Sequence, residues 1–188
     1  EKFPHKNIAA VAVCFLFVVA INKKLREENF YKNNDIEEPN LLSLLDLVAL
    51  GTVCDVMPLS GINRSFVAQG LKVLKQRKNI GIKELSDLIG TDQELTAYHL
   101  GFALGPRINA GGRVGKSSLG AELLSTNSEA IAKENASLLD NFNKSRKDIE
   151  NKILTEADEQ VVKSGLHKDS VIIAHNKDWH QGVIGIIA

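Results

Sequence analysis

The amino-acid sequence predicts a helix-rich α/β fold, on the basis of three observations. Apolar residues recur at helical spacing in residues 62–78 and 127–164. Residues 8–21 form an apolar run that is long enough for a buried helix. The stretch SVIIAH, residues 170–175, is short and rich in β-branched residues, as is typical of a strand. With 188 residues, 44% of them hydrophobic, the chain can fill one large domain or two small ones.

The first predicted helix covers residues 8–28, which are apolar at first and become charged toward the end. Its apolar part, residues 8–21, is shorter than the roughly 20 residues that a membrane span needs. Charged residues also follow within the same helical pattern. We therefore interpret it as a buried core helix, rather than as a membrane span or the core of a signal peptide.

A polar loop, residues 29–40, leads into a second helix that begins at Pro39 and Asn40 and that Gly51 is expected to end. The stretch TVCDVMPL after it is predicted to be a strand or loop, and it carries Asp55 among apolar neighbours. A carboxylate in such surroundings costs free energy unless it is paired or binds a metal. Mg²⁺ and Mn²⁺ prefer oxygen ligands. Asp55 is thus a candidate metal ligand, with a helix cap or a salt bridge as the alternative.

The middle of the chain predicts an amphipathic helix over residues 62–78 and a short helix over residues 82–89. The basic end of the first of these suits the helix dipole. The boundary between two lobes is expected within residues 62–92.

Residues 95–121 contain no Asp or Glu and are rich in glycine. Exposed backbone N–H groups together with Arg107 and Arg113 would make a phosphate cradle, and Asn109 could add a hydrogen bond to sugar or phosphate. The alternative is a mobile glycine loop whose arginines are only solvated. Residues 110–117, AGGRVGKS, come close to a nucleotide-binding P-loop. The preceding ALGPRIN is not the buried strand that a P-loop requires.

A long helix is predicted over residues 127–164, with an apolar stripe that also includes Arg146. An arginine on such a stripe needs partners. It could pair with Asp140 or Glu150, or it could project with Asn143 toward a phosphate.

The last segment, DWHQGVIGIIA, places His180 between the predicted strand and an apolar helix. His180 could donate a hydrogen bond to a phosphate oxygen or take part in proton transfer. A packing or capping role beside Trp179 is the alternative.

Composition limits the function classes. The formal net charge is zero, so any nucleic-acid site must be a local patch. The two cysteines form no CxxC pair, which argues against a disulfide framework or a zinc site and suits a reducing cytoplasm.

Four motifs together, in this order, resemble those of the RecJ-type single-stranded-DNA-specific exonucleases of the DHH phosphoesterase superfamily. That family shows GTVxDVxPL, PRxNAxGR, NxxRxxxE and WHxGVxGI. They stand here at residues 51–59, 106–113, 143–150 and 179–186. Each motif is weak by itself, but four of them in order with suitable spacing are specific.

The resemblance implies three regions: the C-terminal part of a Rossmann-like DHH lobe (1–61), a connecting helical region (62–92) and a partial DHHA1 lobe (93–188). It implies 5′→3′ hydrolysis of single-stranded DNA with Mn²⁺ or Mg²⁺, in DNA repair and recombination. Asp55 would be the last aspartate ligand of the metal site, and His180 would lie beside the scissile phosphate. The strand would be contacted by Arg107, Asn109, Arg113, Asn143 and Arg146.

The chain also departs from the family pattern. The DHH triplet and the earlier aspartates would precede Glu1, and the rest of DHHA1 and a nucleic-acid-binding domain would follow Ala188. Ala10 and Ala12 stand where small glycines are expected, and Gln181 where proline is common. We therefore expect a fragment that is inactive alone. A related DHH phosphoesterase acting on short oligonucleotides, or a non-catalytic remnant, is the alternative.

Overall fold

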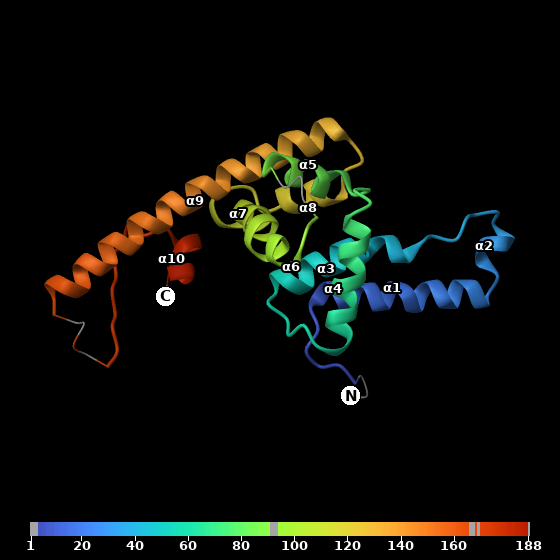
Figure 1. The fold of residues 1–188 in the computed structure, drawn as a ribbon, viewed down its shortest axis with the longest axis horizontal. Helices are drawn as coiled ribbons and strands as arrows, with labels where there is room; N and C mark the ends of the chain where they lie inside the picture. Colours follow the sequence, from blue (N-terminus) through green and yellow to red (C-terminus); the bar gives the residue numbers. More distant parts are fainter. Residues whose placement is uncertain (1–3, 91–93, 166–167, 169, 188) are drawn as a thin grey trace. The chain divides into compact units, whose positions relative to one another are not determined.

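The computed structural model describes residues 4–90, 94–165, 168 and 170–187. Its elements in chain order are α1 (Ala10–Glu27), α2 (Phe30–Asn33), the 3₁₀ turn η1 (Leu41–Leu44), α3 (Leu45–Cys54), α4 (Gly61–Leu74), α5 (Ile80–Leu88), α6 (Ala97–His99), the π-helical η2 (Leu100–Leu104), α7 (Gly105–Val114), α8 (Leu119–Ser125), α9 (Glu129–Lys163) and α10 (Gln181–Ile187) (Figure 1). The helix-rich part of the predicted fold class is confirmed. The described ranges contain no strand, so the α/β class is not confirmed.

The chain forms two compact units, Glu1–Gly105 and Pro106–Ala188. In the first unit, α3 packs against both α1 and α4. Its core contains the buried residues Ala12, Phe15, Leu45, Val48 and Phe66. The rings of Phe15 and Phe66 meet edge to face with centroids 5.8 Å apart. Burying each large side chain of this kind contributes about 1.5–3 kcal/mol, so packing rather than helix propensity holds the unit together.

Helices α3 and α4 approach closely at Gly70. A Cβ atom there would lie 2.1 Å from the backbone oxygen of Leu45 and 2.4 Å from Cβ of Ala49. Only glycine allows the two backbones to come this near. The amphipathic helix predicted over residues 62–78 is thus present as α4, with Phe66, Val67 and Leu74 in the core.

Helix α3 continues past Gly51, so the prediction that this glycine ends the helix was wrong. The stretch TVCDVMPL, predicted to be a strand or loop, is helical in residues 52–54 and a turn and loop in residues 55–59. A Cβ at Gly51 would lie 2.6 Å from Cγ1 of Val11. The glycine therefore serves the close packing of α1 on α3.

Helix α1 forms as predicted, but it is buried on one side only. Ala12 and Phe15 are 0% and 8% exposed, whereas Phe17 is 66% exposed. The expectation of a buried helix holds for one face. Among the described residues, the helices are too short or too polar to cross a membrane.

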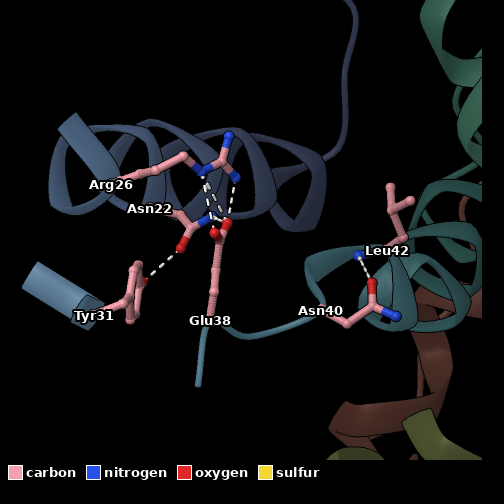
Figure 2. A network of polar contacts seen from close by, with 6 residues as sticks. All are labelled: Asn22, Arg26, Tyr31, Glu38, Asn40 and Leu42. Carbon is pink, nitrogen blue, oxygen red and sulfur yellow. Dashed lines mark hydrogen bonds and ion pairs between the residues drawn. The ribbon is translucent and has the colours of Figure 1, made fainter. Parts of the chain in front are cut away.

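A polar cluster ties the loop after α2 to α1 (Figure 2). The buried Asn22 donates from Nδ2 to Glu38 Oε1 at 2.9 Å and accepts from the Tyr31 hydroxyl. Arg26 also pairs with Glu38 through Nε at 3.1 Å. The hydrogen bond from Arg26, then that from Asn22, holds the pKa of the Glu38 carboxyl below its usual value. Asn40 then starts η1 by accepting from the Leu42 amide at 3.2 Å.

The second unit contains α7, α8, α9 and α10, and both α8 and α10 pack against the long helix α9. Helix α9 forms where a long helix was predicted. Of the apolar stripe predicted for this helix (Leu138, Phe142, Ile149, Ile153 and Ala157), Ile153 is buried, whereas Leu138 is 39% exposed and its neighbour Leu139 is fully buried instead. Close packing at α7 explains the difference: a Cβ at Gly111 would lie 3.1 Å from Cδ2 of Leu139.

The strand predicted for residues 170–175 does not form within the described residues. Val171 and Ile173 are each 72% exposed. The His175 amide donates to Gln160 Oε1 at 2.9 Å, and Gln160 Nε2 donates to the His175 carbonyl at 3.3 Å. One side chain of α9 thus bonds this backbone as a neighbouring strand would. A strand needs a series of backbone hydrogen bonds to a neighbouring strand, and one glutamine side chain supplies only two bonds. The β-branched residues of this segment indicated a strand, but they carry no information on whether such a neighbour is present.

Candidate nucleic-acid and metal sites

Asp55 is the residue at which α3 ends, and it is exposed. Its amide donates to the Gly51 carbonyl at 2.9 Å. Val56 follows with φ of 55°, a left-handed conformation that is strained for a β-branched residue. The chain leaves the helix axis at residue 56. The Met57 amide then donates to the Thr52 carbonyl at 3.1 Å. The expectation that apolar neighbours bury Asp55 was wrong.

The position of Asp55 favours a cation for a different reason. The C-terminal end of a helix carries partial negative charge, so a carboxylate there is disfavoured until a cation binds. Cys54, directly before it, is not a metal ligand candidate. Burial, and then the charge of Asp55, raise the pKa of the Cys54 thiol to about 11. The thiol stays protonated, and its Sγ lies 3.7 Å from the Leu100 carbonyl to which it donates.

No three His, Cys, Asp or Glu side chains come together as a possible metal site in the part of the chain that the structure describes. Asp55 is a single candidate oxygen ligand. The chemistry of this donor suits Mg²⁺ or Mn²⁺, but the donor number falls short of what either ion requires.

The segment PRINAGGR is part of helix α7 and is not a glycine loop. Backbone N–H groups inside a helix bond to carbonyls one turn earlier, so they cannot cradle a phosphate. The prediction of a backbone cradle was therefore wrong. The side chains predicted to bind phosphate, Arg107, Asn109 and Arg113, therefore lie on a helix. Asn109 is exposed on it.

Arg107 connects α7 to α9. Its Nε donates to Asp140 Oδ1 at 2.8 Å, and Lys144 Nζ lies 2.8 Å from Asp140 Oδ2. The Asp140 side chain is 11% exposed and that of Arg107 20%. Burial raises the pKa of the Asp140 carboxyl, but the hydrogen bonds from Lys144 and Arg107 outweigh it and leave that pKa below its usual value. Sequence reasoning did not identify this link, because 33 residues separate the two partners.

The structure brings Arg113 and His180 together around Gly182. Arg113 Nη1 donates to the Gly182 carbonyl at 3.0 Å, and the Gly182 amide donates to His180 Nδ1 at 3.1 Å. A Cβ at Gly182 would lie 2.3 Å from the Arg113 carbonyl oxygen, so the two segments are in direct contact. Because Nδ1 accepts a hydrogen bond, the proton of the neutral imidazole is assigned to Nε2. His180 and Arg113 are both exposed, and each carries an N–H group that can donate to an anion.

Arg146 forms an ion pair within α9, as one of the two predicted alternatives has it. It pairs with Glu150, and its Nε donates to Asn143 Oδ1 at 3.3 Å. The Arg146 side chain is 11% exposed, and Asn143 is 2% exposed. Helical spacing of i and i+4 made the Glu150 pair predictable. A contact of these two residues with a strand stays a prediction.

Two exposed aromatic residues, Tyr98 and Phe102, were overlooked in the sequence. Their spacing of four residues was the available signal, but the segment had been interpreted as a loop. Lys116, the lysine of the near P-loop match, is engaged with Glu122 at 2.7 Å. The residues before it are helical, as a P-loop would not allow.

No family model matches the chain. Its sequence is 42% identical to the single-stranded-DNA-specific exonuclease RecJ of Salmonella typhimurium over 100% of this chain and 33% of the relative. The corresponding figures for RecJ of Escherichia coli are 41%, 100% and 33%. RecJ of Bacillus subtilis is 34% identical over 99% of this chain and 22% of its own length. The chain thus spans about a third or less of these relatives.

Solved structures show the same resemblance. The crystal structure of RecJ from Thermus thermophilus in complex with Mn²⁺ matches with a TM-score of 0.71 and 30% identity, over 84% of this chain and 23% of that one. A structure of exonuclease RecJ bound to manganese matches equally well, over 84% of this chain and 39% of that chain.

Proposed function

We propose that this chain, a confirmed relative of the RecJ-type single-stranded-DNA-specific exonucleases, is part of an enzyme of that kind. The observation that carries the proposal is the sequence match along the whole chain, 42% identical to one such exonuclease. The longer protein would hydrolyse phosphodiester bonds of single-stranded DNA from the 5′ end, in the cytoplasm, for DNA repair and recombination. Residues 1–61 would belong to a Rossmann-like DHH lobe, residues 62–92 would form a connecting helical region, and residues 93–188 would belong to a DHHA1 lobe.

The side chains of the second unit would bind the DNA backbone. Arg113 and His180 lie together at Gly182, where a guanidinium and an imidazole Nε2–H can donate to a phosphate oxygen. Asn109 is exposed on the same α7 helix. Cationic groups that face a phosphate also offset the charge that builds up on it during hydrolysis. This supports a role for Arg113 and His180 in holding the phosphate that reacts.

Asp55 would supply one oxygen ligand to the metal. Mn²⁺ or Mg²⁺, when bound, provides an activated water and stabilises charge on the phosphate oxygens. One carboxylate does not make a binding site for such an ion, so the remaining ligands would come from the longer protein. The 188-residue chain alone should therefore bind single strands without cutting them.

Asp55→Asn in the longer protein tests this function. The substitution keeps the shape of the side chain and removes its charge, so we expect metal-dependent turnover to fall by at least about 100-fold while strand binding persists. The assay follows release from a 5′-labelled single strand with Mn²⁺ present. The shorter chain should leave the same strand intact. Processive degradation by the 188-residue chain, or full activity of the Asp55→Asn enzyme, would contradict the assignment. Preference for very short oligonucleotides would indicate the related phosphoesterase activity.

A further inference from the structure

Tyr98 and Phe102 form an exposed aromatic pair in the first unit. Their rings are stacked, with centroids 5.0 Å apart and planes inclined by 28°. Tyr98 is 66% exposed and Phe102 73% exposed. Large aromatic rings that are left in water forgo the free energy of burial, so a stacked and exposed pair suggests a partner.

The pair is held in a fixed orientation. The rings of Tyr98 and His99 meet edge to face, with centroids 5.9 Å apart. His99 is anchored in turn, because its Nδ1 accepts from the Thr96 amide at 3.1 Å. A ligand would therefore find the two rings already arranged, and would lose little free energy in ordering them.

The opposite side of the same segment lies on the end of α3. Leu100 and Leu104 are fully buried, and the Leu100 carbonyl accepts from Cys54 Sγ. A Cβ at Gly101 would lie 3.3 Å from Cγ1 of Val53. These contacts attach the aromatic pair to the last turn of α3, which leads directly into Asp55. The five residues of η2 are π-helical, a conformation that occurs frequently at functional sites.

The charges along the segment suit a polyanion. Residues 95–105, which carry the aromatic pair, contain no Asp or Glu. Glu94, just before them, is paired with Lys75 at 2.5 Å. A DNA backbone that follows this segment would meet no unpaired carboxylate on it. Exposed aromatic rings on which bases stack are a feature that single-strand-binding proteins use.

We propose that Tyr98 and Phe102 form a stacking platform for a base of single-stranded DNA. This inference rests on the proposed function and adds a contact with the bases to contacts with the backbone. Stacking of one base contributes about 1–3 kcal/mol, which corresponds to about 5- to 150-fold in Kd. It does so for any base, since every base has an aromatic face.

The test compares two strands of equal phosphate number, an oligothymidylate and an abasic strand, by fluorescence anisotropy with the 188-residue chain. Replacing both rings, Tyr98→Leu with Phe102→Leu, should weaken oligothymidylate binding by about 5-fold or more. Binding of the abasic strand should not change, because the phosphate contacts remain. The matched control, Tyr98→Phe with Phe102→Tyr, keeps both rings and should bind both strands as the unmodified chain does.

Arg113→Ala separates this inference from the function on which it rests. It should weaken both strands alike. Suppose that Arg113→Ala weakens binding of both strands, whereas the double variant Tyr98→Leu with Phe102→Leu binds both strands as the unmodified chain does. The stacking platform is then contradicted, and the proposed single-strand binding is retained. If the unmodified chain binds neither strand, the proposed function and the platform both fail. If the leucine variant weakens both strands equally or changes the sedimentation of the chain, the rings serve folding or a protein contact, which also overturns the platform. Circular dichroism and the single variants Tyr98→Leu and Phe102→Leu show whether folding is affected.

Discussion

Asp140 links helix α9 to helix α7 through an ion pair with Arg107. It accepts from Arg107 on one oxygen and pairs with Lys144 on the other, and it is almost buried. The partners differ in their surroundings: the Lys144 side chain is 68% exposed, whereas that of Arg107 is 20% exposed. An exposed ion pair contributes little to stability. Loss of the Asp140 carboxylate would replace the charged acceptor of the half-buried Arg107 Nε by a neutral one, which weakens this hydrogen bond.

Asp140→Asn should lower the free energy of unfolding by about 1–3 kcal/mol at neutral pH, since the hydrogen bonds to a charged group are weakened. The folded-state pKa of Asp140 is lowered. Its contribution is therefore fully present above the unfolded pKa of about 3.9, and it is lost as pH falls through the lower folded-state pKa. Urea unfolding of both proteins across acidic pH should show their stabilities converging. Lys144→Met, which removes the exposed partner, should cost less than about 1 kcal/mol. Equal losses from both substitutions would mean that the buried pair has no special role.

Helix contacts, rather than local pattern, explain where sequence-based prediction failed. The helices at residues 62–78, 82–89 and 127–164 were predictable because their apolar periodicity is local. Gly51 and the glycines of residues 105–114 were misinterpreted as helix breakers or loop residues. Inside these helices Gly51, Gly105 and Gly111 allow close contact with side chains far away in sequence, which local propensity cannot indicate.

In the candidate site too, contacts between neighbouring turns were predictable and contacts between distant segments were not. The pairing of Arg146 with Glu150 is one helical turn long and was predictable. The contacts of Arg107 with Asp140 and of Arg113 with Gly182 span 33 and 69 residues, and no spacing in the sequence indicates them. The types of the site residues and a partner one helical turn away could be predicted, whereas partners far away in sequence could not.

Gly70→Ala tests the close contact of α3 and α4. The added methyl group would overlap the Leu45 carbonyl and Ala49, so the two helices must separate, at a cost of about 1–3 kcal/mol or more. The matched control is Gly112→Ala in α7, where an added Cβ meets nothing within 4 Å. That substitution should stabilise the helix by roughly 0.5–1 kcal/mol, because alanine is the better helix former. Thermal unfolding of both variants gives the comparison, and a neutral Gly70→Ala would show that the helices do not pack this closely.

For the chain as a whole, a formal net charge of zero gives no net long-range attraction to DNA. Binding must then depend on a few local cations. Arg113→Ala should reduce the slope of log affinity against log salt by roughly 0.7, the counterion release for one single-strand phosphate contact. Lys116→Ala is the comparison, since its ammonium is already paired with Glu122 and its loss should change the slope less. The slopes come from anisotropy titrations at several salt concentrations, and an unchanged slope for Arg113→Ala would mark this arginine as structural.

The two thiols of the chain differ in a way that is useful at the bench. Cys14 is exposed on α1, whereas Cys54 is half-buried and its pKa is raised to about 11. The thiolate is the form that reacts with maleimides. At neutral pH a dye will therefore attach to Cys14 and leave Cys54 unmodified. The natural sequence thus offers a single labelling position in the unit that carries Asp55 and the aromatic pair, with no cysteine replaced beforehand.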